Sequence, residues 1–171
     1  WPRSPSRTDG CSRSPAPMRS PIGYCPGSDG FITTAGVFSD GQVDKGSALL
    51  AAALPTKLPP RIADLGAGWG YLSAQVMSHS EVASVDLIEA EALALDCARL
   101  NITDPRATFH WADATRFAAD TPFDAIVMNP PFHQGVQTEY ETTERFLRDV
   151  PSALNPGGRF WLVANHFLPY E

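Results

Sequence analysis

The sequence has few of the features that mark membrane, metal-binding or disulfide-stabilised proteins. Its 171 residues, the size of one domain, include no apolar run close to the ~18 residues of a membrane-spanning helix, so we expect no membrane contact. Its three cysteines are an odd number without metal-ligand or redox spacing, which argues against a disulfide framework and a metal site. We therefore predict a cytoplasmic protein without a metal, and a monomer.

Acidic residues are scarce in the first thirty positions and abundant afterwards. Residues 1–30 hold four arginines and two aspartates among many serines, prolines and glycines, a composition typical of a disordered or non-native leader. Residues 31–171 hold nine basic and seventeen acidic residues, a net charge of −8. An RNA substrate would then need a local patch or another domain for its affinity.

Short apolar segments alternate with helical patterns from residue 44 onward. Asp44 stands at an N-cap position before a helix that begins at Lys45. The helix over residues 91–101 is predicted to place Leu93, Cys97 and Leu100 on one face. We predict helices over 45–54, 70–78 and 91–101, strands over 61–65, 82–89, 107–111, 123–128 and 159–163, and a tight turn over 155–158. This alternation predicts an α/β fold, a mostly parallel sheet with helices on both faces.

A glycine-rich turn follows the first strand of that sheet, in the sequence Asp64-Leu-Gly-Ala-Gly-Trp-Gly70. Glycines at alternate positions permit the backbone angles of a sharp turn, and their missing side chains let a ligand approach the backbone. Strand, glycine turn and helix together are typical of nucleotide-binding α/β units. Tight turns in such proteins also use glycine for structural reasons alone.

Polar side chains stand at the carboxyl ends of the predicted strands, where open parallel sheets bind ligands. Glu89 lies about where an acid would bind ribose hydroxyls after a glycine turn, and Asp86 is the rival candidate. Asp113 is placed to accept a hydrogen bond from the exocyclic amine of a purine. Each carboxylate, Asp64 included, has the alternative role of capping the following helix.

The segment Asn129-Pro-Pro-Phe132 has the strongest chemical signature. The Asn129 carboxamide oxygen and a neighbouring carbonyl form a pair of acceptors that two prolines hold stiff. Such a pair suits a planar amino group with two N–H donors, and the aromatic side chain can stack on its ring. The reaction should therefore depend on alignment more than on proton abstraction. A proline-stiffened loop with a buried Phe132 is the structural alternative.

Together with the glycine turn, this segment resembles the class I S-adenosylmethionine-dependent methyltransferases that methylate amino nitrogens. The finer resemblance is to bacterial small-subunit ribosomal RNA guanine-N2 methyltransferases, and it covers about residues 31–171. The residues that carry it are Gly36-Val-Phe-Ser39, Asp44, Gly46-Ser47, Asn129-Pro-Pro-Phe-His133, Gly135, Val163-Ala-Asn165 and Leu168-Pro-Tyr170. The resemblance implies a Rossmann-like fold, S-adenosyl-L-methionine as cofactor, and ribosomal RNA or the small ribosomal subunit as partner.

The resemblance also implies where the cofactor binds. Its contacts would be Asp64, Gly66 and Gly68 at the methionine end, Glu89 at the ribose, and Asp113 with Ala114 at the adenine. The register of Glu89 against the family pattern is fixed by Ala98-Arg99 and Asn101.

The implied catalytic residues are Asn129, Pro130 and Phe132. Asn129 and the Pro130 carbonyl would hold the guanine amino group while Phe132 stacks on the flipped base. The implied substrate contacts are Phe38, Pro131 and His133, with Phe38 closing over the site. His133 could instead act as a base or pack within its loop, and the sequence names no partner for it.

Two parts of the family pattern are missing from the sequence. Family members have a second, degenerate methyltransferase-like domain where residues 1–30 hold the leader. They also continue beyond Glu171 with a helix and two strands, so we expect residues 31–171 to form a catalytic domain that is incomplete at its C-terminus. Its fifth strand would be an exposed apolar edge. We therefore expect reduced stability and weak or absent turnover from this chain.

Other functions fit parts of the pattern. The same Asn-Pro-Pro-aromatic loop serves enzymes that methylate adenine N6 or a protein glutamine amide. An NAD-dependent oxidoreductase would share the glycine turn and the acid after the second strand, but it gives no reason for Asn129-Pro-Pro-Phe132. A methyltransferase-like binding domain without activity is the non-enzyme alternative.

Overall fold

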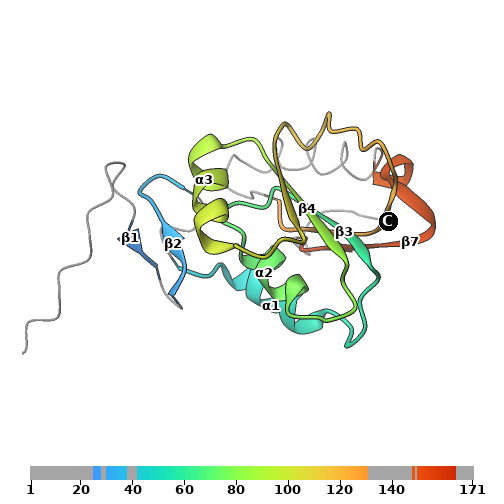
Figure 1. The fold of residues 1–171 in the computed structure, drawn as a ribbon, viewed down its shortest axis with the longest axis horizontal. Helices are drawn as coiled ribbons and strands as arrows, with labels where there is room; N and C mark the ends of the chain where they lie inside the picture. Colours follow the sequence, from blue (N-terminus) through green and yellow to red (C-terminus); the bar gives the residue numbers. More distant parts are fainter. Residues whose placement is uncertain (1–24, 28–29, 38–41, 131–147, 149, 165–171) are drawn as a thin grey trace, which may run out of the picture.

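A five-stranded parallel sheet forms the centre of the molecule (Figure 1). The computed structural model describes residues 25–27, 30–37, 42–130, 148 and 150–164. Its elements are β1 (Cys25–Pro26), β2 (Ile32–Thr33), α1 (Lys45–Ala53), β3 (Arg61–Leu65), α2 (Tyr71–Met77), β4 (Ser84–Glu89), α3 (Ala92–Asn101), β5 (Ala107–Trp111), β6 (Phe123–Met128) and β7 (Leu154–Leu162). The strand order is β5-β4-β3-β6-β7, and every neighbouring pair is parallel. The predicted α/β fold is confirmed.

Strands β1 and β2 pair antiparallel outside this sheet, and β2 lies beside α3 (Figure 1). Asn101 fixes this contact, because its Oδ1 accepts from the Ile32 N–H at 2.6 Å and its Nδ2 donates to the Ile32 carbonyl at 2.8 Å. Strand β1 falls within the segment that the composition assigns to a leader. Among the described helices, none has the length and apolarity to span a membrane.

Strand β4 begins at Ser84, two residues later than predicted. Val82 is buried but does not join the ladder, because its carbonyl accepts a hydrogen bond from the Arg106 guanidinium. The N–H groups of Ala83 and Ser84 both donate to the Pro60 carbonyl, and strand pairing starts only after this crossing point. The apolar run over residues 82–89 therefore predicts burial correctly but places the start of the strand two residues too early.

Strand β7 begins at Leu154, five residues earlier than predicted, and includes the segment over which a tight turn is expected. Leu154 pairs with Phe123 and Arg159 with Ala125, so the residues between them form an irregularity within the strand. Gly157 there has a φ of +80°, a value that other residues rarely adopt. The predicted turn over 155–158 therefore lies inside β7 as an irregularity, where the chain leaves and rejoins the same strand pair, and not before the strand.

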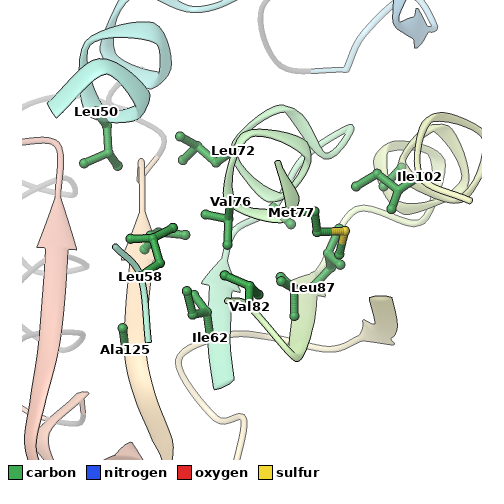
Figure 2. Close-up of a cluster of buried hydrophobic side chains, with 14 residues drawn as sticks. Leu50, Leu58, Ile62, Leu72, Val76, Met77, Val82, Leu87, Ile102 and Ala125 are labelled. Carbon is green, nitrogen blue, oxygen red and sulfur yellow. The ribbon is translucent and has the colours of Figure 1, made fainter. Parts of the chain in front are cut away.

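Helices α1, α2 and α3 cover one face of the sheet, as their buried side chains show (Figure 2). This cluster includes Leu50 of α1, Val76 of α2 and Ala98 of α3, packed against Ile62 of β3. On the opposite face, the helical residues 150–153 contribute Val150 to a second cluster with Ala63, Leu65, Ile88, Phe123, Ile126 and Met128. Two apolar clusters therefore sandwich the sheet, as expected for parallel strands.

The apolar face predicted for α3 is wrong in two of its three residues. Cys97 is fully buried, but Leu93 and Leu100 are 39% and 49% exposed. The buried stripe is instead Ala94, Leu95, Cys97 and Ala98. A Cβ at Gly70 would lie 3.4 Å from the Ala98 Cβ, so the helix approaches the glycine turn too closely for larger side chains at this contact.

Arg106 ties the segment at the end of α2 to the turn before β5, and its loss should destabilise the fold. The guanidinium donates to the carbonyls of Met77, His79 and Val82 at 2.6–3.2 Å and pairs with Asp104 at 2.7 Å. Arg106→Ala would remove a charged donor from each of these carbonyls, so we expect a fall of several degrees in the melting temperature.

Arg99→Ala is the control for Arg106→Ala. Arg99 makes a half-exposed ion pair with Asp96 on the same helix, at 2.8 Å. Such surface pairs contribute little to stability, so this variant should melt close to the wild type in the same calorimetric scan. Equal losses in the two variants would contradict a special role for Arg106.

Candidate active site

A narrow cleft lies where the carboxyl ends of β3 and β6 meet. The two strands are parallel neighbours, with Leu65 opposite Met128, so the segments that follow them emerge side by side. The cleft is tight, with a volume of about 30 Å³. Its lining residues are Asp44, Ser47, Gly66, Ala67, Gly68, Trp69, Tyr71, Leu72 and Asn129. The glycine turn, the start of α1 and the residue after β6 thus share one site.

The glycine turn presents open backbone to this cleft. Gly66 and Gly68 have φ values of +74° and +57°, and a Cβ built on either would meet nothing within 4 Å. Gly70, the N-cap of α2, differs, because a Cβ there would lie 2.8 Å from the Ile102 side chain. Gly66 and Gly68 therefore leave space for a ligand, whereas Gly70 is required for packing.

Asp64, at the end of β3, is completely buried beside this turn. Its Oδ2 accepts a hydrogen bond from the Ser73 hydroxyl at 2.7 Å, while its Oδ1 has no partner among the described residues. Burial raises the pKa of the Asp64 carboxyl to about 7, and the nearby charge of Glu89 contributes to this rise. A cationic donor placed at Oδ1 would favour the ionised form.

The raised pKa of Asp64 should make the free energy of unfolding depend on pH. The folded state holds a proton on Asp64 up to pH about 7, whereas an unfolded chain releases it near 3.8. The free energy of unfolding should therefore decline as pH rises from 4 to 7, by up to about 4 kcal/mol from this group. Asp64→Asn cannot ionise, so denaturant titrations across this range should show a shallower decline and a more stable variant at pH 8. Parallel curves for the two proteins would contradict the assignment.

Glu89 lies across from the glycine turn at the end of β4. Its Oε2 accepts from the Gly68 N–H at 2.7 Å and its Oε1 from the Glu91 N–H at 2.8 Å. Its rival for the ribose role, Asp86, is engaged elsewhere, with His110 Nε2 at 2.7 Å and the Arg61 guanidinium at 3.5 Å. The geometry therefore favours Glu89, because its carboxylate already contacts the turn.

Asp113 and Ala114 follow β5 and do not belong to the lining of the cleft described above. The preceding Ala112 N–H donates to the Glu89 carbonyl at 3.0 Å, which places this segment beside Glu89. The Asp113 carboxylate accepts from both the N–H and the hydroxyl of Thr115, at 2.9 and 2.7 Å. Ala114 lines a separate cavity with residues that include Leu65.

Asn129 is 8% exposed, and the described residues hold its carboxamide from the Nδ2 end. Its Nδ2 donates to Asp44 Oδ2 at 2.8 Å and to the Ser47 hydroxyl at 2.7 Å. Its Oδ1 is buried and has no partner among the described residues. The sequence correctly predicts Asp44 as the N-cap of α1, since its Oδ2 also accepts from the Ser47 N–H at 2.9 Å. It does not indicate the contact with Asn129.

Trp69 and Tyr71 are further lining residues that receive no role from the sequence. With Phe31 they form an aromatic group whose ring centroids lie 5.0–5.9 Å apart. The Trp69 carbonyl also accepts from Asn101 Nδ2 at 2.8 Å. The segment around β2 is thus held against the glycine turn. In the sequence, the only indication that Trp69 lines the cleft is its position within that turn.

Four predicted site residues lie outside the described part of the chain, namely Phe38, Pro131, Phe132 and His133. Pro130 is described and is buried directly after Asn129. The structure therefore brings Gly66, Gly68 and Asn129 into one cleft. Glu89 contacts Gly68 in its wall, and Asp64 lies buried at the start of the glycine turn.

The sheet order, the glycine turn after β3 and the Asn-Pro pair after β6 define a Rossmann-like class I methyltransferase fold. The chain belongs to the methyltransferase small domain family, whose model matches residues 29–171.

Relatives agree with this assignment. The chain is 40% identical over 141 residues to the ribosomal RNA small subunit methyltransferase C of Hahella chejuensis, covering 82% of this chain and 41% of that protein. The protein of the same name from Pseudomonas aeruginosa is 37% identical over 145 residues, covering 81% and 42%. The chain thus spans about two fifths of the length of these curated relatives.

Solved structures give the same picture. The T. thermophilus 16S rRNA N2 G1207 methyltransferase, in complex with AdoMet and guanosine, superposes with a TM-score of 0.69 at 32% identity, covering 82% of this chain and 40% of that one. An S-adenosylmethionine-dependent methyltransferase from Mesorhizobium loti gives a TM-score of 0.55 at 29% identity, covering 67% and 51%.

Proposed function

We propose that residues 31–171 transfer a methyl group from S-adenosyl-L-methionine to an exocyclic amino nitrogen, namely N2 of guanine in ribosomal RNA. The observation that carries this proposal is the cleft in which the glycine turn meets Asn129, whose buried Oδ1 has no partner among the described residues. An unpaired buried acceptor is costly unless a ligand donates to it. The names of the relatives, which are small-subunit ribosomal RNA methyltransferases, support guanine in RNA as that ligand.

The described residues fit the cofactor. Asp64 Oδ1, buried and without a described partner, suits the cationic amino group at the methionine end. Gly66 and Gly68 leave the space that a Cβ would fill, and Glu89 keeps unused lone pairs for ribose hydroxyls. Asp113 and Ala114, beside Glu89, would contact the adenine. When bound, the cofactor supplies an electrophilic methyl group on a sulfonium.

The residues of the chain orient the acceptor. Asn129 Oδ1 and the Pro130 carbonyl would accept hydrogen bonds from the two N–H groups of the amino group and direct its lone pair toward the methyl carbon. The sulfonium would supply the methyl group and keep the electron pair of its C–S bond, so the residues of the chain need only align the nitrogen, which would lose a proton to water. Phe132 would stack on the base, with Phe38, Pro131 and His133 as further substrate contacts.

The proposal includes the ribosomal RNA or the small subunit as substrate, a monomeric enzyme and a cytoplasmic setting. The same acceptor pair could also orient adenine N6 or a protein glutamine amide, which form the alternative. Nucleoside analysis of the methylated RNA separates guanine N2 from adenine N6, and label incorporated into protein would indicate the amide.

The test has two stages. Calorimetric titration should show micromolar binding of S-adenosylhomocysteine and none of NAD. Because we expect weak turnover from this chain, the second stage uses a long incubation with a high enzyme concentration. Radiolabelled S-adenosylmethionine should then label unmodified 16S RNA or small subunits, with N2-methylguanosine as the product. Binding of NAD alone would contradict the proposed cofactor. A labelled product other than N2-methylguanosine would contradict the proposed methyl acceptor.

A further inference from the structure

The carboxamide of Asn129 has only one chemically acceptable orientation. A carboxamide has a donor end and an acceptor end of almost the same shape, so only its partners distinguish them. Asp44 Oδ2, 2.8 Å from Asn129 Nδ2, is part of a carboxylate that can accept but cannot donate when ionised. A flipped carboxamide would place its oxygen against that carboxylate. Asp44 therefore selects the orientation in which Asn129 Oδ1 is turned away from Asp44.

The residues around this contact leave little room for movement. Ser47, at 8% exposure, supplies the second acceptor for Asn129 Nδ2, and its own N–H is fixed by Asp44 Oδ2 at 2.9 Å. A Cβ at Gly46 would lie 2.9 Å from Asp44 Oδ2 and 3.4 Å from Asn129 Oδ1. The first turn of α1 thus packs against the side chain that follows β6, and Gly46 is small enough to allow it.

We propose that Asp44 and Ser47 are positioning residues of the proposed reaction. They accept hydrogen bonds from both N–H groups of the Asn129 carboxamide, so that its Oδ1 is the atom presented to the substrate. This inference rests on the proposed function. The ionised Asp44 also polarises the carboxamide and strengthens Oδ1 as an acceptor. The arrangement favours an amino group over a keto oxygen, because a keto oxygen would face Oδ1 with no proton between them.

The competing explanation is structural: Asp44 caps α1, and the three side chains merely satisfy one another in the core. Ser47→Ala separates the two explanations. It removes one acceptor from Asn129 Nδ2 but leaves the cap, because Asp44 accepts from the backbone N–H of residue 47. Ser78→Ala is the matched control, since the Ser78 hydroxyl also makes one hydrogen bond, to the Gln75 carbonyl, on the exposed end of α2.

The expected result is a fall of about tenfold in kcat for Ser47→Ala, with the KM for the cofactor and the S-adenosylhomocysteine affinity unchanged. In an Asn129→Ala background the same change should have no further effect on kcat. Ser78→Ala should match the wild type. Unchanged kcat in Ser47→Ala, or equal losses with and without Asn129, would leave only the structural role and overturn the inference.

A second measurement does not require turnover. In ¹⁵N NMR spectra of the full chain, the Nδ2 protons of Asn129 should exchange slowly with solvent, faster in Ser47→Ala, and at the wild-type rate in Ser78→Ala. Equal exchange in the wild type and Ser47→Ala would overturn the inference. Failure of S-adenosylhomocysteine to bind the wild type would instead count against the proposed function, and the exchange rates would still decide whether Ser47 holds Asn129.

Discussion

Asn129→Ala should lower the rate of methyl transfer by about 10² or more, while S-adenosylhomocysteine binds with nearly the wild-type affinity. The variant removes the buried Oδ1 that would orient the amino group and leaves the glycine turn intact. Misplacement of the attacking nitrogen affects the chemical step far more than the binding of the cofactor. Single-turnover rates and calorimetric affinities, measured on the same preparation, check both halves of the expectation.

Asn155→Ala is the matched control for Asn129→Ala. Asn155 Nδ2 donates to Asp124 Oδ1 at 2.8 Å within the irregular part of β7, and Asn155 is not among the residues of the cleft. Its removal should change the melting temperature slightly and leave the rate of methyl transfer unchanged. A rate in Asn129→Ala within threefold of the wild type would remove Asn129 from the reaction.

Gly68→Asp should abolish binding of S-adenosylhomocysteine. The new side chain would occupy the open space beside the turn, and its charge would lie close to Glu89, whose Oε2 is 2.7 Å from the Gly68 nitrogen. The φ of +57° at this position adds backbone strain, although aspartate tolerates it better than most residues. Titration calorimetry at cofactor concentrations well above the wild-type dissociation constant measures the loss.

Gly157→Asp is the control that separates the effect of backbone strain from the effect of filling the ligand site at Gly68. Gly157 has a φ of +80°, and a Cβ at this position, as at Gly68, would meet nothing within 4 Å, but Gly157 lies in the irregular part of β7. This variant should bind S-adenosylhomocysteine as the wild type does. If both variants lost binding equally, the effect would come from the fold, and the glycine turn would not be assigned to the site.

The sequence predicts β3, β5 and β6 with their observed bounds, because each is a short segment with strand-forming residues bounded by turn residues. It fails where tertiary contacts decide the outcome. Strand β4 starts late because Pro60 and Arg106 bind the residues before it. In α3, the close approach of Ala98 to Gly70 requires a small residue on the buried stripe, and periodicity does not reveal this contact.

The residues of the site are likewise predictable from the sequence where local patterns locate them, and not where tertiary contacts do. Glycine turns and residues at strand ends can be located from the sequence, since parallel strands bring their carboxyl ends together. The contact between Asp44 and Asn129 joins residues 85 positions apart, and nothing local to either residue indicates it. Asp44 satisfies a short-range pattern as an N-cap, and its second hydrogen bond becomes visible only in three dimensions.

The adjacency of β3 and β6 couples ligand binding to cooperative folding. The chain makes the whole excursion through β4 and β5 before β6 returns to pair with β3, so no local fragment contains both halves of the cleft. A ligand that contacts both halves binds only molecules in which the central strands have assembled. By mass action, a hundredfold excess over its dissociation constant adds about 2.7 kcal/mol to the free energy of unfolding of the entire sheet. Protection by the ligand should therefore extend to the far ends of the strands, well beyond the residues that touch it.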